Sequence, residues 1–78
     1  MNSQANSAFA ATLRKLRNER GMSQYTLAKV TDLDRTYISL LERGLRSPSL
    51  DTMLALAKGL NVSLVEMAAA VESALLAS

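Results

Sequence analysis

Residues 22–44 read MSQYTLAKVTDLDRTYISLLERG, the pattern of two short helices joined by a tight turn. Ser23 precedes the first helical segment and Asp34 the second, and both side chains can accept hydrogen bonds from the free amides of a helix start. Residues 31–33 supply the turn. Gly44 ends the second helix in a left-handed conformation, which costs glycine little. The stretch therefore predicts two capped, amphipathic helices in close succession.

Three further helical segments surround this pair and make the predicted fold all-α, with five helices in one domain over residues 1–78. The predicted helices span about residues 7–20, 23–30, 34–43, 50–59 and 63–78. The polar residues 1–6 are expected to be a disordered tail, and the helix from residue 63 is expected to serve dimerisation. In the fourth helix, the stripe expected to be buried consists of Leu50, Met53, Leu56, Ala57 and Leu60.

Composition excludes several kinds of chemistry. The 78 residues include no cysteine and no histidine, so the chain has no disulfide, no zinc finger, no thiol nucleophile and no histidine base. The carboxylates are few and scattered, and no catalytic constellation emerges. We therefore expect no enzyme activity, no metal, no cofactor and no small-molecule ligand.

The two terminal segments indicate the cellular compartment in which the protein is expected. The amino-terminal residues lack the charged and apolar regions of a signal peptide. Glu66 and Glu72 interrupt the apolar carboxy-terminal segment, which argues against a membrane span. We expect a cytoplasmic protein with no membrane partner.

Charge is unevenly distributed although the total is only +2. Residues 1–46 carry eight basic and four acidic side chains, whereas residues 47–78 carry one basic and three acidic side chains. The first part suits an anionic partner such as DNA phosphate, and the second suits contact with protein.

The apolar, capping and charged positions coincide with those of a known family over about residues 9–67. The matching positions are Phe9, Leu13, Leu16, Arg17, Met22, Ser23, Gln24, Leu27, Ala28, Leu33, Ile38, Ser39, Leu41, Glu42, Arg43, Gly44, Pro48, Ser49, Leu50, Leu56, Ala57, Leu60, Val62, Ser63, Leu64 and Met67. The chain resembles the phage-repressor-like helix-turn-helix family, which includes the lambda repressor and Cro-type proteins. Residues 33–39 with Glu42, Arg43 and Arg46 look most like the controller proteins of restriction–modification systems.

This resemblance implies a compact lambda-repressor-like domain whose second and third helices form the helix-turn-helix, with double-stranded DNA as the partner. Two positions depart from the family pattern. Asp32 stands in the turn where glycine is usual, and aspartate adopts the left-handed conformation at some cost. Gly59 stands where alanine is usual, which is expected to weaken the last turn of the fourth helix by roughly 1 kcal/mol.

The third helix is expected to read bases in the major groove with its first turn, which makes Arg35, Thr36, Tyr37 and Ser39 the candidates. Arg35 suits the two acceptors of guanine, and Tyr37 is long enough to reach a phosphate from the rim. The alternative for Arg35 and Tyr37 is an ordinary solvated surface.

Three other side chains are candidates for contacts with phosphate. Gln24 resembles the family's amide that contacts phosphate and braces the recognition helix. Arg43 and Arg46 flank the end of that helix, where they would position the protein without reading sequence. The alternative for Gln24 is an ordinary residue at a helix start, and the alternative for Arg43 and Arg46 is a charge in solvent.

Arg17 and Glu42 occupy positions where family members form an internal ion pair between the first and third helices. The resemblance therefore implies a structural role for both. Arg14, Lys15 and Arg20 are expected to form a solvated face.

The last helix carries more apolar surface than one small domain can bury, and the economical solution is a two-fold homodimer. The expected dimer residues are Leu54, Val65, Ala68, Ala69, Val71, Leu75 and Leu76. A wider intramolecular core or a frayed tail would also account for this surplus.

The sequence thus predicts a homodimeric transcriptional regulator that binds a pseudo-palindromic operator, either a restriction–modification controller or an autoregulating repressor. RNA polymerase is a candidate partner if the protein activates transcription. The family's activators often carry acidic residues on the second helix, where this chain has Tyr25 and Lys29, and this difference slightly favours a repressor. The alternatives are an antitoxin of the same fold and a helical protein–protein module without DNA binding.

Overall fold

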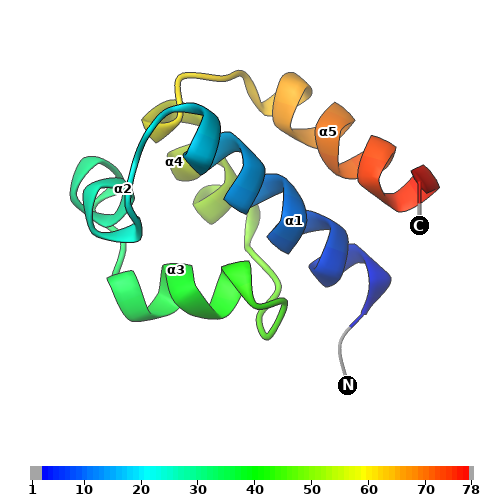
Figure 1. Cartoon of the computed structure of the whole chain (residues 1–78), viewed down its shortest axis with the longest axis horizontal. Helices are drawn as coiled ribbons and strands as arrows, with labels where there is room; N and C mark the ends of the chain where they lie inside the picture. The colour runs from blue at the N-terminus through cyan, green and yellow to red at the C-terminus, as the bar shows by residue number, and fades with distance from the viewer. Residues whose placement is uncertain (1–2, 78) are drawn as a thin grey trace.

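The part of the chain that the structure describes folds into five α-helices, as the sequence predicts. The computed structural model describes residues 3–77 and is drawn in Figure 1. The helices are α1 (Gln4–Glu19), α2 (Gln24–Thr31), α3 (Arg35–Glu42), α4 (Leu50–Gly59) and α5 (Leu64–Ala77).

The first helix begins at Gln4 rather than near residue 7. Ser3 has extended backbone angles, and its Oγ accepts a hydrogen bond from the Asn6 amide at 2.9 Å, which satisfies one of the free amides of the first turn. Ala8 is already buried, so the first turns have packing to hold them. The disordered tail expected over residues 1–6 is therefore wrong for residues 3–6, while Met1 and Asn2 lie outside the described residues.

The other helix starts use the caps that the sequence predicts. Ser23, Asp34 and Ser49 accept hydrogen bonds from the amides of Thr26, Thr36 and Thr52, respectively. At the start of α5, the Ser63 amide donates to Glu66 Oε1 at 2.8 Å and the Glu66 amide donates to Ser63 Oγ at 3.0 Å. This reciprocal pair fixes where α5 begins after the turn from α4.

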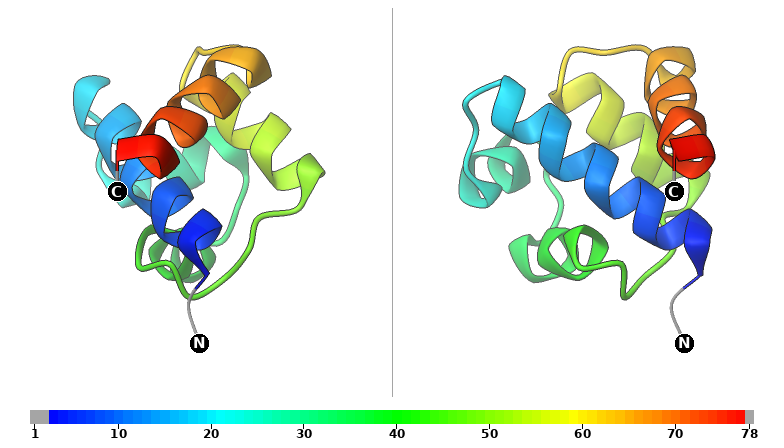
Figure 2. Two further views of the ribbon diagram at one scale, coloured as in Figure 1. Left: turned by 90° about the vertical axis from the view of Figure 1, so that its right-hand side faces the viewer. Right: turned by 45° about the vertical axis from the view of Figure 1, so that its right-hand side comes forward.

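One core joins the five helices. Its fully buried side chains are Leu13, Leu27, Ile38, Leu41, Leu56, Leu60 and Met67, so every helix contributes at least one. Helix α1 contacts both α3 and α5, α2 contacts α3 and α4, and α4 also contacts α5. Figures 1 and 2 show α1 passing between α3 and α5, which places the outer sides of these two helices at opposite ends of the molecule.

The turn after α2 takes the left-handed form at a residue that is not glycine. Asp32 has φ 61°, as expected for an aspartate that replaces the family's glycine, and Gly44 has φ 73° after α3.

Gly59 has a packing role that differs from the weakened helix turn expected there. A Cβ there would lie 2.6 Å from Thr31 Cγ2 and 3.3 Å from Val30 Cγ2. The absent side chain thus lets α4 approach α2 closely, a tertiary reason that local helix propensity does not reveal.

Helix α4 turns one face inward and another outward. Leu56, Ala57 and Leu60 are buried, but Leu50 is 62% exposed, so the expectation that Leu50 belongs to the buried stripe is wrong. Leu50 lies in the first turn of α4, and Leu54, four residues later, is exposed as well. Within residues 3–77 no single helix is long and apolar enough to cross a membrane, and α4 and α5 meet that requirement only together, across a bend of 105°.

Candidate nucleic-acid interface

The first turn of α3 and the start of α2 form a small hollow on the surface. Gln24, Arg35, Thr36 and Ser39 line this hollow, whose volume is about 190 Å³. Asp34 fixes the start of α3, because its Oδ1 accepts a hydrogen bond from the Thr36 amide at 2.7 Å. The structure therefore brings together three of the four candidate base-reading residues and one of the candidate phosphate-binding residues.

Tyr37, the fourth candidate, faces a different neighbour. Its side chain is half-buried and packs against the core, and its hydroxyl lies 3.3 Å from Thr52 Oγ1 on α4. Ser49 Oγ donates to the same Thr52 oxygen at 3.0 Å, so a chain of hydroxyl groups links α3 to the start of α4. Local spacing does not predict this role of Thr52, because the contact bridges two helices and the loop between them.

Glu42 lies at the centre of a buried polar junction among α1, α2 and α3. The residue is 3% exposed, and its carboxylate accepts hydrogen bonds from Arg17 Nε at 2.6 Å and from Arg17 Nη2 at 2.9 Å. The ion pair that the resemblance implied is thus present, in the bidentate geometry that favours arginine. The hydrogen bonds to Glu42 raise the pKa of Arg17 above its ordinary value, and partial burial of the guanidinium opposes this effect.

The junction also fixes Gln24. Its Nε2 donates to Glu42 Oε1 at 3.1 Å. Because a carboxylate can only accept, the amide nitrogen of Gln24 must face Glu42, and the orientation of the whole side chain is set. Gln24 therefore braces α3, while it also borders the hollow.

Two arginines of the expected solvated face are exposed, as predicted, but each also has a structural partner. Arg14 donates to the Glu42 carbonyl oxygen, and Arg20 Nε donates to the Leu60 carbonyl oxygen at 2.8 Å. Both bonds satisfy carbonyl groups at a helix end, which the sequence could not assign because the partners are 28 and 40 residues away.

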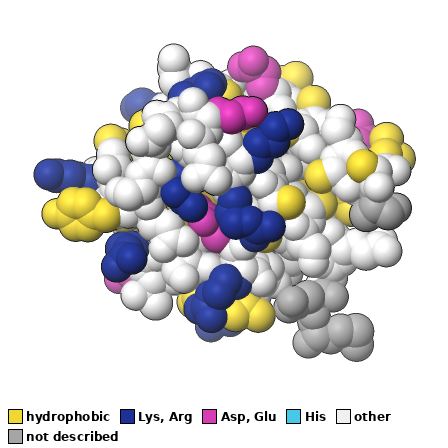
Figure 3. Space-filling view, viewed as in Figure 1, with side chains coloured by type: hydrophobic (Ala, Val, Ile, Leu, Met, Phe, Trp, Pro, Cys, Tyr) yellow, Lys and Arg dark blue, Asp and Glu magenta, His cyan; other side chains and the backbone are white. Residues whose placement is uncertain are grey.

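Arg43 and Arg46 lie exposed at the end of α3 and in the loop that follows it. Each uses one guanidinium nitrogen locally: Arg43 Nε donates to the Ser39 carbonyl at 3.4 Å, and Arg46 Nη1 donates to the Leu45 carbonyl at 3.2 Å. Figure 3 shows that Lys and Arg side chains spread over the left and centre of the view, where α1, α2 and α3 lie, while hydrophobic side chains gather toward α5 on the right. The arrangement matches the uneven charge of the sequence.

The expected dimer residues divide into two groups. Leu54, Val65 and Leu76 are 46%, 77% and 83% exposed, and Ala68 and Ala69 are exposed beside them. In contrast, Val71 is half-buried and packs against the core, and Leu75 is half-buried as well. Val71 thus belongs partly to the domain's own interior, because it lies four residues after the buried Met67 on the same face of α5.

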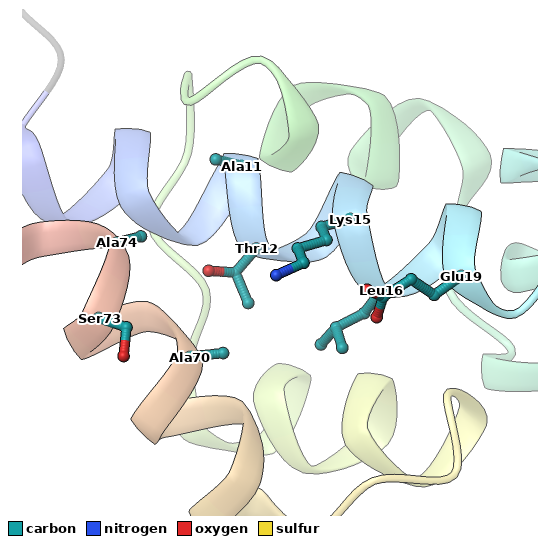
Figure 4. Close-up of a pocket in the computed structure, with 8 residues that line it drawn as sticks. All are labelled: Ala11, Thr12, Lys15, Leu16, Glu19, Ala70, Ser73 and Ala74. Carbon is teal, nitrogen blue, oxygen red and sulfur yellow. The ribbon is translucent and has the colours of Figure 1, made fainter. Parts of the chain in front are cut away.

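A second, larger hollow of about 370 Å³ lies between α1 and α5 (Figure 4). Ala11, Thr12, Lys15, Leu16, Glu19, Ala70, Ser73 and Ala74 line it. The small side chains of α5 leave this space beside α1, on the side of α1 that faces away from α3 (Figures 1 and 2). This larger hollow is therefore separate from the surface around α3 that carries Arg35, Arg43 and Arg46.

Comparison with known proteins places these features in context. Residues 13–67 match the family described as Helix-turn-helix. The chain is 41% identical over 59 residues to the control protein C.SmaI of Serratia marcescens, covering 76% of this chain and 70% of that one. It is 40% identical over 65 residues to the control protein C.MunI of a Mycoplasma species, covering 82% and 88% of the two chains.

The solved structures that are similar to this chain include restriction-modification controller proteins as well. The restriction-modification controller protein C.Esp1396I, determined as a tetramer in complex with its natural 35 base-pair operator, is 36% identical with a TM-score of 0.88, over 95% of this chain and 97% of that one. The controller protein C.AhdI from Aeromonas hydrophila is 42% identical with a TM-score of 0.77, over 80% and 94% of the two chains.

Proposed function

The chain belongs to the helix-turn-helix family of DNA-binding transcriptional regulators, and from that membership we propose the roles of its individual residues and its mode of assembly. Arg35, Thr36 and Ser39 read base edges from the first turn of α3. Gln24, Arg43 and Arg46 contact phosphate. The observation that carries this assignment is the hollow, because it gathers Gln24 and the exposed first turn of α3 on one surface.

Tyr37 has a different place in the proposal. Its hydroxyl meets Thr52 rather than the hollow. We therefore assign Tyr37 to the rim of the base-reading surface, where it reaches DNA beside α4 rather than from the centre of the groove.

The regulator acts as a homodimer on a pseudo-palindromic operator. The exposed apolar side chains of Leu54, Val65 and Leu76 support this assembly, since burying them requires a partner surface. Two-fold symmetry would set two copies of α3 about one DNA turn apart. The controller protein C.Esp1396I, which is similar over nearly the whole chain, assembles as a tetramer on its operator.

The biological role that we propose is control of a restriction–modification system or repression of the protein's own promoter. The similar control proteins C.SmaI and C.MunI support the first of these. Such a regulator acts by binding rather than by catalysis and works in the cytoplasm, where its operator is. If it activates transcription, RNA polymerase is its protein partner.

Two substitutions test the division between base-reading and phosphate-binding residues. Arg35→Ala should weaken binding to the cognate operator by about 1–3 kcal/mol per half-site and leave binding to random duplex nearly intact. Arg46→Ala should weaken binding to both duplexes to a similar degree and flatten the salt dependence by about one unit per lost contact. Fluorescence anisotropy with both duplexes over a series of salt concentrations measures both effects.

Several outcomes would contradict the proposal. Equal losses on operator and random DNA for Arg35→Ala would make Arg35 a phosphate contact. A change of sequence preference for Arg46→Ala at unchanged salt dependence would make Arg46 a base-reading residue. Absence of any DNA binding by the wild-type chain would favour a protein–protein module, and capture of a toxin would favour an antitoxin.

A further inference from the structure

The loop after α3 is held against the first turn of α1. Ser47 Oγ donates a hydrogen bond to Asn6 Oδ1 at 2.7 Å across 41 residues of sequence. Gly44 lies so close to this turn that a Cβ there would be 3.7 Å from the Asn6 carbonyl oxygen and 3.7 Å from Ser7 Cα. Asn6 therefore lies directly beside the end of the recognition helix.

In the structure the Asn6 amide turns its oxygen toward Ser47 and leaves its nitrogen for other partners. The Oδ1 atom accepts from Ser47, and both amide hydrogens are on Nδ2. Within residues 3–77, Nδ2 has no hydrogen-bond partner. Two oriented donors are thus presented at the edge of the loop.

These donors have basic neighbours. Arg43 precedes Gly44 and Arg46 precedes Ser47, so the two residues that touch Asn6 or its turn each follow an exposed arginine. Figures 1 and 2 show the start of α1, the loop and α3 along the same side of the molecule. Paired amide hydrogens next to a loop that carries two exposed arginines suit the oxygens of an anionic backbone.

We propose that the DNA-contact surface of each subunit continues past the end of α3 to Asn6, whose side-chain amide donates to a backbone phosphate. Ser47 is the positioning residue that directs this amide. The inference rests on the proposed function, because it extends the surface formed by Arg43 and Arg46 by one contact. Asn6 reads no sequence and strengthens binding to all duplexes.

The decisive variant is Asn6→Asp. An aspartate keeps the acceptor for Ser47, and it suits the third position of a helix, so the fold should be as stable as that of the wild type. The carboxylate removes both donors and repels phosphate, so binding to operator and to random duplex should fall by more than about tenfold. Asn18→Asp is the matched control, since it changes the net charge equally at an exposed site near the other end of α1.

Two further variants sharpen the test. Asn6→Ala should weaken binding about tenfold with an unchanged salt slope, because the lost donor is neutral. Ser47→Ala should cause a smaller loss, because the amide is then no longer held in one orientation. Thermal unfolding of each variant separates these effects from loss of fold.

The outcomes separate this inference from the proposed function. If the wild-type chain binds DNA but Asn6→Asp weakens binding no more than Asn18→Asp does, the contact at Asn6 is refuted and the proposed function stands. Binding of Asn6→Ala at the wild-type level would refute the contact in the same way. If the wild-type chain binds no duplex, both fail together.

Discussion

The junction around Glu42 and the outer face of α4 and α5 are built in opposite ways. At the junction a carboxylate that is 3% exposed receives hydrogen bonds from Arg17 and Gln24, so three helices are tied by satisfied polar groups. On the outer face, Leu54 and Val65 lie 46% and 77% exposed. A single chain therefore completes the junction but not this face.

The contrast shows how the domain divides its tasks. The helices that carry the candidate DNA contacts are fixed before any partner arrives, because their polar network is internal. The apolar side chains on α4 and α5 gain their stabilisation only when a second surface covers them. The satisfied polar network thus lies near the proposed base-reading residues, and the exposed apolar side chains proposed for association lie at the opposite end of the molecule.

Breaking the junction should have the largest effect. Glu42→Ala leaves the Arg17 guanidinium without its carboxylate, and we expect a loss of about 3–5 kcal/mol in the free energy of unfolding. Urea unfolding at neutral pH measures this loss. The double variant Arg17→Met with Glu42→Leu should recover much of it, because apolar side chains need no partner charge. A cost below about 1 kcal/mol for Glu42→Ala would mean that the pair behaves like an exposed ion pair.

Changing the outer face should leave the fold intact and remove the dimer. We expect Leu54→Lys combined with Val65→Glu, which preserves the net charge, to give a folded monomer whose operator affinity is lower by about 10²–10⁴-fold. Sedimentation equilibrium gives the mass, and anisotropy gives the affinity. Tyr25→Lys with Val30→Glu alters two exposed apolar residues of α2 in the same way and should remain dimeric. A wild-type chain that sediments only at 8.4 kDa at high concentration would refute the dimer.

The side of α4 that packs against α2 should tolerate added side-chain volume less well than its exposed side does. Gly59→Ala gains helix propensity of about 1 kcal/mol but forces a methyl group against Thr31, and we expect a net loss of about 1 kcal/mol in stability. Thr31→Ser removes the opposing methyl group and keeps the hydroxyl that donates to the Leu27 carbonyl at 2.7 Å. Adding Gly59→Ala to Thr31→Ser should therefore cost nothing in thermal unfolding. If Gly59→Ala alone raises the melting temperature, the approach of the two helices is looser than the structure indicates.

The smallest effect should come from the start of α5. The Ser63 amide and then the Ser63 hydroxyl, both bonded to Glu66, lower the pKa of its carboxyl, and the positive charge of Arg20 adds to this effect. The ionised carboxylate of Glu66 therefore stabilises the fold fully at a pH above 4.5, the ordinary pKa of glutamate. This stabilisation is lost as the pH falls through the lower pKa that Glu66 has in the folded chain. The difference in melting temperature between the wild type and Glu66→Gln should accordingly shrink on acidification. A difference that stays constant with pH would show that the charge of Glu66 has no part in the cap.

The sequence predicts most of the fold because its signals are local. Ser23, Asp34 and Ser49 mark helix starts, and apolar spacing marks the inward faces. The start at Ser3 is not predictable in this way, since the polar residues there resemble a tail until Ala8 is seen to be buried. The exposure of Leu50 is not predictable either. The apolar spacing identifies a stripe along α4, but it does not show how far along this stripe the core extends.

The candidate site is less predictable from the sequence than the fold. Arg35, Thr36 and Ser39 follow from the geometry of a recognition helix, and the resemblance implies the pair of Arg17 and Glu42. The contact between Tyr37 and Thr52 joins separate elements and depends on how α3 and α4 cross. Such long-range contacts are decided by packing and not by spacing along one helix.

The ion pair of Arg17 and Glu42 has a consequence for how the protein is made. Twenty-five residues separate the two partners, and at a synthesis rate of about 5–20 residues per second that interval takes about 1–5 s on the ribosome. During this time the residues of α1 have been added to the chain, but the carboxylate that pairs with Arg17 has not. The contact that ties α1 to α3 can therefore form only after α3 has been synthesised in full.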